Sequence, residues 1–425
     1  MSEFLRLRSP ENARALLLSH MVLPDQETES VPSGQALGRI TAEDIMAPHG
    51  LPEFARSTVD GYAVRARDTY GASPSLPVYL RLRGEVPMGV LATVEARASE
   101  CLLIHTGGML PPGADAVVML ENTQAASVDH ESGSDESESE IEIHRAAASG
   151  ENVIGVGEDV KPGQVVLGAG SRLRPQEIGG LMALGLTTVL VKRKPRIAVI
   201  STGDEIVDPQ TQPAPGQVRD VNSSSLAALV ADAGGEPVLL GVVPDRPDEL
   251  ASAARTALST SDLVIISAGS SASARDLTAS TINALGEPGV IVHGVNIRPG
   301  KPTILGICGG KVVIGLPGNP VSALVVARLF VVPAILKWLG LGEGRPQPSI
   351  RAKLSVNVAS QTGREDWWPM RLHRAPSGME PEWVAEPIFS RSNLIFGLVA
   401  AQGLMCVAAE KNGMTAGEIV TVELF

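Results

Sequence analysis

The sequence predicts an α/β protein of several domains, in which a central domain with a parallel sheet is accompanied by additional β-rich modules. Three observations predict this class. At about 150 residues per domain, the 425 residues correspond to roughly three domains. Between residues 194 and 340, short apolar runs alternate with segments of helical periodicity. The composition, 44% apolar and 19% charged, excludes intrinsic disorder as the overall state.

The N-terminal part predicts one helix followed by a β-rich module. Residues 9–22 should form the helix, because Ser9 can cap it and Pro10 suits its first position. From about 46 to 146 the apolar residues alternate with period two between Pro and Gly turns, which is typical of strands. Residues 129–142 (DHESGSDESESEIE) hold seven acids and no base, so they predict a solvated loop.

The central part predicts a parallel sheet, because four apolar runs alternate with helical segments. Asn222 or Ser223 can cap one helix, and the last helix, from Asn319, is apolar on nearly all sides, which is typical of a buried helix or a subunit interface. From 349 onward the pattern is again typical of strands. The predicted central strands are 196–200, 237–243, 263–266 and 312–315.

Charge and cysteine content limit the partners and the compartment. The formal net charge of −12 argues against nucleic acid as the main ligand. Three widely spaced cysteines exclude a disulfide scaffold and a zinc ribbon. The N-terminus lacks the pattern of a secretory signal, and the longest apolar stretch, 321–336, falls short of a span of about 20 residues. We therefore expect a cytoplasmic protein that does not bind membranes.

Polar segments follow all four central strands, and three of them contain glycine. In open parallel sheets, ligands bind at the carboxyl ends of the strands, so these segments predict a ligand crevice. Taken singly, each segment could equally be a tight turn. The segments are Ser201–Glu205, Pro244–Asp245, Ser267–Ser271 and Leu316–Pro320.

The segment Arg298-Pro299-Gly300-Lys301-Pro302 is the best candidate for an anion site. Two prolines stiffen it, the glycine permits close approach to a ligand, and two cations lie three residues apart. The alternative is a solvated basic turn. A P-loop is excluded, because Val295 and Pro302 stand where that motif needs Gly and Ser or Thr.

Acidic residues at the predicted sheet edge could hold a divalent cation that bridges ligand phosphates, as in Mg²⁺ sites. Singly, each acid is more simply a helix cap or a turn residue. The acids are Asp204, Glu205, Asp245 and Asp276.

Six motifs occur in order along nearly the whole chain, and the set is far more specific than any one of them. It resembles the molybdopterin molybdenumtransferase family (MoeA), the type that includes the gephyrin E domain. The motifs are Leu51–Phe54 with Ser57–Val64, His105–Gly108 with Pro112–Val118, Gly157–Val160, Ser201–Glu205, Arg298–Pro302 and Leu316–Ser322.

The resemblance implies an elongated homodimer of four-domain subunits that inserts molybdate into adenylylated molybdopterin. Phosphoanhydride cleavage, promoted by Mg²⁺ or another divalent cation, would release AMP in molybdenum cofactor biosynthesis, and the molybdopterin adenylyltransferase is a further expected partner. The implied domains are an N-terminal linker and dimer domain (1–45 with 147–193), a β-rich inserted domain (46–146), a molybdopterin-binding α/β domain (194–340) and a C-terminal β-barrel-like domain (349–425).

The resemblance also implies roles for individual residues. Asp60, Thr106 and Asp159 would face the site from the partner subunit, and Glu205, Asp245 and Asp276 would serve the metal and the phosphates. The catalytic candidates are Asp60, Asp159, Asp276 and Lys301. The substrate-binding candidates are Thr106, Thr202, Gly203, Ser267, Gly269, Arg298, Gly318, Asn319 and Ser322, with Arg371 and Ser392 in the last domain.

The chain departs from the family pattern after the third central strand. Two glycines and one glutamate of that pattern are absent between Ser267 and Asp276, and Ala and Ser resist the backbone conformations that glycine allows. The second Asp of a usual pair is Arg246, and the first Lys of the usual Lys-Pro-Gly-Lys is Arg298. Two hypotheses therefore remain: an active molybdenum insertase, or a divergent non-catalytic pterin-binding or scaffold protein with the same fold.

Overall fold

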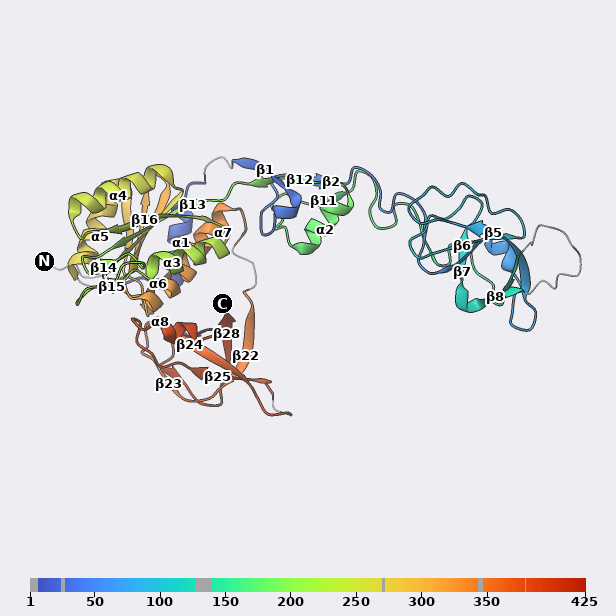
Figure 1. Cartoon of the computed structure of the whole chain (residues 1–425). Helices are drawn as coiled ribbons and strands as arrows, with labels where there is room; N and C mark the ends of the chain where they lie inside the picture. Colours follow the sequence, from blue (N-terminus) through green and yellow to red (C-terminus); the bar gives the residue numbers. More distant parts are fainter. Residues whose placement is uncertain (1–6, 24–26, 127–138, 270–271, 343–346, 379) are drawn as a thin grey trace, which may run out of the picture. The chain divides into compact units, whose positions relative to one another are not determined.

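The computed structural model describes residues 7–23, 27–126, 139–269, 272–342, 347–378 and 380–425, with the backbone alone for 272–274. The chain divides into two compact units (Figure 1). One comprises Met1–Glu29 and Lys192–Phe425, and the other comprises Ser30–Val191.

The first unit contains a six-stranded sheet in the order β16-β13-β17-β21-β20-β18. The four predicted strands lie side by side and run parallel, which confirms the α/β fold of this domain. The sheet also contains two strands that were not predicted, β20 and β18, which are antiparallel to their neighbours and make the whole sheet mixed. The strands are β13 (Arg196–Thr202), β16 (Glu236–Val243), β17 (Leu263–Ala268), β18 (Pro288–His293), β20 (Ile304–Cys308) and β21 (Lys311–Pro317).

Helices cover both faces of this sheet (Figure 1). On one face, α4 and α5 pack over strands whose apolar side chains, such as Ile200 and Ile266, are fully buried. On the other face, α3 packs against α6, and α1 packs against α7. The helices are α1 (Pro10–His20), α3 (Asn222–Asp232), α4 (Pro247–Thr260), α5 (Ala272–Leu285), α6 (Pro320–Val326) and α7 (Val332–Trp338), the last two joined by the π-helical turn η4 (Ala327–Val331).

The continuous helical run Pro320–Trp338 is the element expected to be buried. By length and composition alone it could cross a membrane, so the expectation that this apolar stretch is too short was wrong, but 61% of its apolar 18-residue window is buried inside the protein. Phe330 and Ala334 are fully inaccessible. Such burial is typical of a core helix, in agreement with the sequence prediction.

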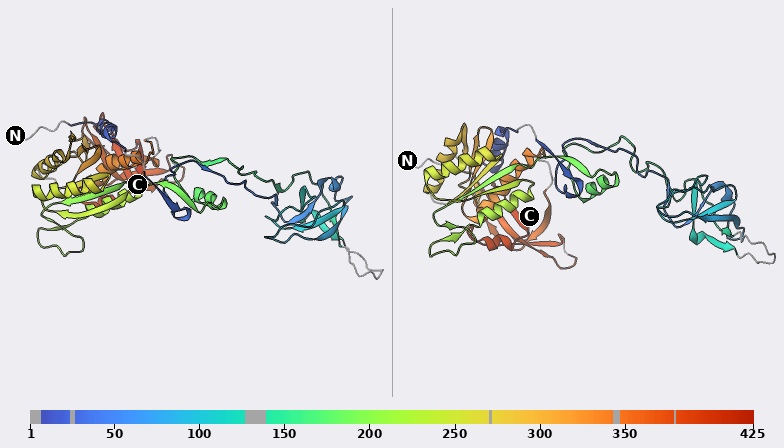
Figure 2. Two further views of the ribbon diagram at one scale, coloured as in Figure 1. Left: turned by 90° about the horizontal axis from the view of Figure 1, so that it is seen from above. Right: turned by 45° about the horizontal axis from the view of Figure 1, so that its top comes forward.

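The end of the same unit forms a small closed barrel, which can be seen next to the α/β domain in the right view of Figure 2. Strand β24 pairs with both β25 and β26, and β22 and β28 close the ring between them. The two-residue strand β19 (Ile297–Arg298) adds to the outside of β24. The barrel strands are β22 (Ser349–Leu354), β24 (Glu365–Arg374), β25 (Trp383–Pro387), β26 (Gly403–Val407) and β28 (Ile419–Leu424), with β23 (Val358–Ala359), β27 (Gly413–Met414) and the helix α8 (Ile395–Val399) nearby.

The second unit holds a β-rich module and a narrower one. The β-rich module is a six-stranded sheet in the order β7-β4-β6-β5-β9-β8, as its period-two pattern predicts. The narrower module consists of two-stranded ribbons and the helix α2 (Pro175–Ala183). The sheet strands are β4 (Gly61–Val64), β5 (Val78–Glu85), β6 (Glu100–Ile104), β7 (Ala116–Met119), β8 (Thr123–Ala126) and β9 (Glu140–Ile143); the ribbons pair β1 (Thr28–Pro32) with β12 (Thr188–Lys192), β2 (Ile45–Met46) with β11 (Val165–Leu167), and β3 (Arg56–Ser57) with β10 (Val153–Ile154).

Two local predictions need correction. The acidic loop predicted over 129–142 lies largely in 127–138, outside the described residues, but its end is strand β9, because Ile141 and Ile143 alternate with glutamates and are buried. Asn222 does not cap α3 but is its first residue. The Asp220 carboxylate accepts a hydrogen bond from the Ser223 amide (3.1 Å) and takes the capping role.

Candidate active site

The carboxyl ends of the parallel strands meet at one edge of the central sheet, as the strand–turn pattern predicts. The Thr202 hydroxyl, at the end of β13, donates to the carboxylate of Asp245, which follows β16 (2.5 Å). The Asp245 amide in turn donates to the Asp204 carboxylate (3.3 Å). This contact places the two aspartates beside each other at the exit of neighbouring strands.

A second group of contacts joins the ends of β17 and β21. Asn222, at the start of α3, donates through Nδ2 to Ser267 Oγ (2.8 Å) and to the Gly318 carbonyl (2.9 Å). Gly318 allows the ends of β17 and β21 to lie close together, because a Cβ there would lie 2.8 Å from the Ala268 carbonyl oxygen. Asn222 Oδ1 is buried and has no hydrogen-bond partner among the residues described. It is an acceptor that a ligand could satisfy, and sequence reasoning assigned Asn222 only a capping role.

The acids at this edge fit a cation held jointly by protein and ligand. Within the described residues, no three His, Cys, Asp or Glu side chains cluster closely enough to form a metal cage. Mg²⁺ is commonly held by one or two carboxylates together with ligand phosphates, which the neighbouring Asp204 and Asp245 suit. Glu205 is exposed directly after Asp204, and Asp276 is exposed in the first half of α5. Residues 270–271 of the divergent loop lie outside the described residues.

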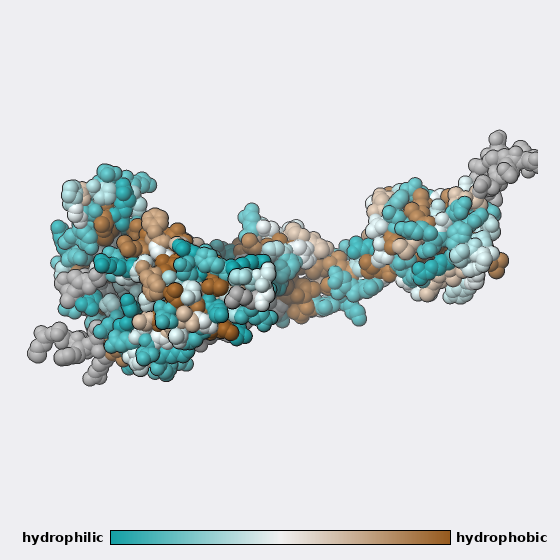
Figure 3. Space-filling view, turned by 90° about the horizontal axis from the view of Figure 1, so that it is seen from below, coloured by the Kyte–Doolittle hydropathy of each residue, from teal (hydrophilic) through white to brown (hydrophobic). Residues whose placement is uncertain are grey.

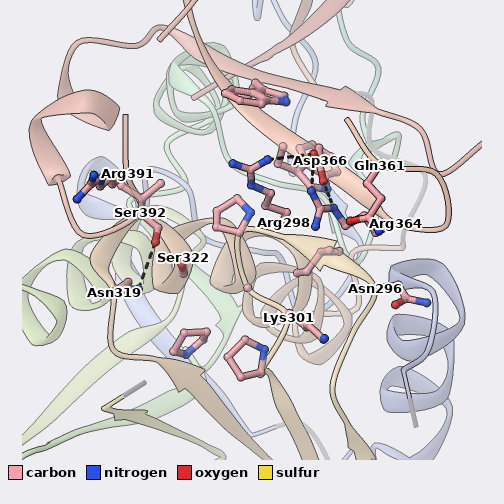
Figure 4. Close-up of a pocket in the computed structure, with 18 of the residues that line it drawn as sticks. Asn296, Arg298, Lys301, Asn319, Ser322, Gln361, Arg364, Asp366, Arg391 and Ser392 are labelled. Atoms are coloured by element: carbon pink, nitrogen blue, oxygen red, sulfur yellow. Dashed lines mark hydrogen bonds and ion pairs between the residues drawn. The ribbon is translucent and has the colours of Figure 1, made fainter. Parts of the chain in front are cut away.

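A pocket of about 670 Å³ opens between the α/β domain and the barrel (Figure 4). It brings together five residues that the sequence predicted, namely Arg298, Lys301, Asn319, Ser322 and Ser392. Asn319 Nδ2 donates to Ser392 Oγ (3.2 Å), and the Val321 amide donates to the Ser392 carbonyl (3.1 Å), so the barrel loop is fixed on the start of α6.

Sequence reasoning missed the polar residues that the barrel contributes to this pocket. Asp366 lies at the start of β24 and Arg364 immediately precedes that strand. No motif or spacing links them to Arg298; only the pairing of β19 with β24 does so. Arg371, by contrast, does not line the pocket, and its guanidinium is 3.6 Å from the Glu386 carboxylate. The polar lining residues that the sequence did not predict are Asn296, Gln361, Thr362, Arg364, Asp366, Ser390 and Arg391.

The sheet edge and the pocket adjoin each other. Pro317 and Asn319 line the pocket, while the carbonyl of Gly318 between them accepts the Asn222 hydrogen bond at the sheet edge. The turn Pro317–Asn319 therefore forms part of both the sheet edge and the pocket. A ligand bound at the edge of the sheet would lie next to an anion held in the pocket.

The second unit presents its own group of candidate residues. Asp60 Oδ1 accepts hydrogen bonds from the Thr106 amide (2.7 Å) and hydroxyl (3.1 Å). These bonds, the amide first, hold the pKa of Asp60 below its ordinary value. His105 lies between two carboxylates, with Nε2 3.0 Å from Glu85 and Nδ1 3.7 Å from Asp60. Asp159 is exposed, and its amide donates to the Leu51 carbonyl (2.9 Å).

Comparison with family models covers most of the chain. Residues 8–185 match the MoeA N-terminal region (domain I and II), and residues 351–425 match the MoeA C-terminal region (domain IV). Residues 198–337 match the family described as "Probable molybdopterin binding domain". The three matches follow one another in the order of the motifs found in the sequence.

Individual relatives align over nearly the full length. The chain is 33% identical to the molybdopterin molybdenumtransferase of Haemophilus influenzae, covering 98% of both chains. It is also 33% identical to a putative molybdopterin biosynthesis protein of Methanocaldococcus jannaschii, covering 98% of this chain and 97% of that one. A crystal structure of the molybdopterin biosynthesis MoeA protein of Pyrococcus horikoshii is similar with a TM-score of 0.81 at 31% identity, over 99% and 100% of the two chains.

Proposed function

This chain belongs to the MoeA family of molybdopterin molybdenumtransferases, and from that premise we propose how its own residues perform the transfer. The protein is a transferase of molybdenum cofactor biosynthesis. We propose that its substrates are adenylylated molybdopterin and molybdate, and that the phosphoanhydride is cleaved with release of AMP. The observation that carries the proposal is the pocket beside the sheet edge, because four of its lining side chains are cationic in a chain of net charge −12.

The pocket is suited to the molybdate dianion. Arg298 and Lys301 place a guanidinium and an ammonium on one stiff turn, and Ser322 adds a buried hydroxyl from α6. The sheet edge would bind the pterin and its phosphates through Thr202, Ser267 and neighbouring backbone groups. A divalent cation bound there would neutralise charge on the departing phosphate, with Glu205, Asp245 and Asp276, and the neighbouring Asp204, as its candidate protein ligands.

We further propose a cytoplasmic homodimer in which Asp60, Thr106 and Asp159 complete the site of the partner subunit. The proposed subunit has four domains, formed by residues 1–45 with 147–193, 46–146, 194–340 and 349–425. The narrow module of the second unit supports it, because several large apolar side chains are exposed there, and Figure 3 shows hydrophobic side chains on its surface. They are Leu37, Met46, Val165 and Met182. Light scattering tests this directly, since a stable monomer of 44.3 kDa at micromolar concentration would refute it.

The transfer reaction is tested with purified full-length protein, adenylylated molybdopterin, molybdate and Mg²⁺. The measurement is molybdenum cofactor and AMP formed per minute. Lys301→Ala should lose on the order of a hundredfold in rate. Lys411→Ala, an exposed lysine outside the pocket lining, is the matched control and should keep the parental rate. A parent protein that binds the pterin substrate but forms neither product, under varied oxyanion and metal conditions, would favour the non-catalytic scaffold instead.

A further inference from the structure

A buried carboxylate lies between two arginines in the wall of the pocket (Figure 4). The Asp366 side chain is only 1% exposed. Arg364 donates to it with two groups of its guanidinium, Nε to Oδ1 (2.8 Å) and Nη2 to Oδ2 (3.3 Å). Arg298 approaches the same carboxylate from the other domain, with Nη1 3.6 Å from Oδ2. One acid thus contacts both guanidinium groups.

The strand register explains why these three side chains meet. Strand β19 runs parallel to β24, and in this ladder Arg298 is the direct partner of Asp366. The Glu365 amide donates to the Asn296 carbonyl (3.0 Å) and supports the same register. Trp368 is two residues beyond Asp366, on the same face of β24, and the Arg298 Cζ lies 5.4 Å from its ring centroid. Arg298 is therefore held by two successive side chains of one strand face.

We propose that Arg364 is a further oxyanion-binding residue and that Asp366 is the positioning residue that orients Arg298 and Arg364 as one clamp. This inference rests on the proposed binding of molybdate in the pocket. A guanidinium has five N–H donors, and Arg364 directs two of them at Asp366, so three are left for a ligand. A planar guanidinium fork can donate to two oxygens of a tetrahedral oxyanion at once.

The clamp sets which charge the pocket prefers. Four cations, Arg298, Lys301, Arg364 and Arg391, line it against the single carboxylate of Asp366, a formal balance of 4 − 1 = +3 among the described lining residues. A dianion gains more from two fixed guanidinium groups than a monoanion of the same shape. Asp366 keeps those groups fixed, although its own charge opposes the anion. When Asp366 is neutralised, the loss of orientation therefore predicts weaker molybdate binding, whereas the higher positive charge of the pocket predicts tighter binding.

The experiment measures binding of two tetrahedral oxyanions, molybdate (dianion) and perrhenate (monoanion), to the full-length protein by titration calorimetry. Asp366→Asn should weaken molybdate binding about tenfold although the pocket becomes more positive, and should change perrhenate binding less than threefold. Arg364→Gln should give the same pattern. Arg374→Gln is the matched control, because Arg374 lies on the same strand and stacks on a tryptophan, Trp383, outside the pocket lining. It should leave both affinities within twofold.

The possible results test the positioning role of Asp366 separately from the binding of an oxyanion in the pocket. Tighter binding of both anions by Asp366→Asn would show that net charge alone governs the pocket and would refute the positioning role. Equal loss of both anions, together with a lowered melting temperature, would reduce Asp366 to a structural residue. Arg364 is 31% exposed, so Arg364→Gln tests the clamp even where Asp366→Asn fails to fold. A parent protein that binds neither anion would refute the oxyanion pocket itself.

Discussion

Gly300 offers the sharpest test of how the pocket is built, because two separate costs oppose a side chain there. Its φ of +115° lies where residues with a Cβ are strained, which costs about 1–2 kcal/mol. A Cβ would also collide with Val326 and would lie 2.8 Å from Ile297 Cδ1, and such overpacking costs about 1–3 kcal/mol. Gly300→Ala should therefore lower the free energy of unfolding by about 2–5 kcal/mol.

Gly309 separates these two costs. It has a φ of +58°, in the left-handed region that residues with a Cβ can adopt, and a Cβ there would have no atom within 4 Å, so Gly309→Ala bears only a backbone cost that is no larger than the one at Gly300. Alanine also restricts the unfolded chain equally in both variants, so this effect cancels in the difference. Gly300→Ala should be less stable than Gly309→Ala by about 1–3 kcal/mol, a further fall in melting temperature of roughly 2–12 °C for a domain of this size.

The same substitution should impair oxyanion binding. Val326 belongs to α6, which also carries Ser322, so relief of the collision moves two walls of the pocket at once. Arg298 and Lys301 flank Gly300, and displacements near 1 Å are enough for large losses at such sites. Urea titration gives the stability and calorimetry gives the molybdate affinity, which should fall at least about tenfold. Equal stability of the two alanine variants, with unchanged molybdate binding, would refute this account of the turn.

Three further results are expected. Asp276→Asn should reduce turnover by on the order of a hundredfold if its carboxylate serves the cation; a parental rate would place that ligand elsewhere. Because its pKa is lowered, Asp60 should stay charged below its ordinary pKa, so Thr106→Val should shift the acid limb of the rate profile to higher pH. Burial raises the pKa of Cys101 to about 12 and that of Cys308 to about 11. Because these thiols ionise at lower pH in the unfolded chain than in the folded protein, the free energy of unfolding should fall as pH rises above 9. In Cys101→Ala this fall should be smaller.

The sequence allowed much of the central domain to be predicted, because its regular elements carry local signals. The four parallel strands are apolar runs that end at polar turns, three of which contain glycine, and the structure has them as neighbours in one sheet. The antiparallel pair β20 and β21 was missed although its signal is present: Gly309 and Gly310, both with positive φ, join two apolar runs as in a tight hairpin. The barrel was predicted only in outline, since its longest strand, β24, includes polar residues at its start and its end.

The residues of the candidate site also fall into two groups, those with a local sequence signal and those without one. Lys301, Asn319 and Ser322 could be found because each belongs to a short motif at the end of a strand. Arg364 and Asp366 could not, because their place in the pocket depends on a pairing between β19 and β24, which are far apart in the sequence. Asn222 was noticed as a cap, but its unpartnered Oδ1 becomes visible only once Ser267 and Gly318 are seen to occupy its Nδ2.

The Arg298–Pro302 segment explains why the pocket lies between two domains. Pro299 has no amide hydrogen to donate, so β19 ends after Arg298, which remains paired with the barrel strand β24. Gly300 then turns the chain, and the Lys301 carbonyl accepts from the Val295 amide (3.0 Å), which ties the lysine to the α/β domain. The two cations of one short motif are thus anchored on different domains. Any change that separates β19 from β24 should remove Arg298 from the pocket and leave Lys301 in place. The anion site therefore contains both cations only when the barrel is docked on the α/β domain.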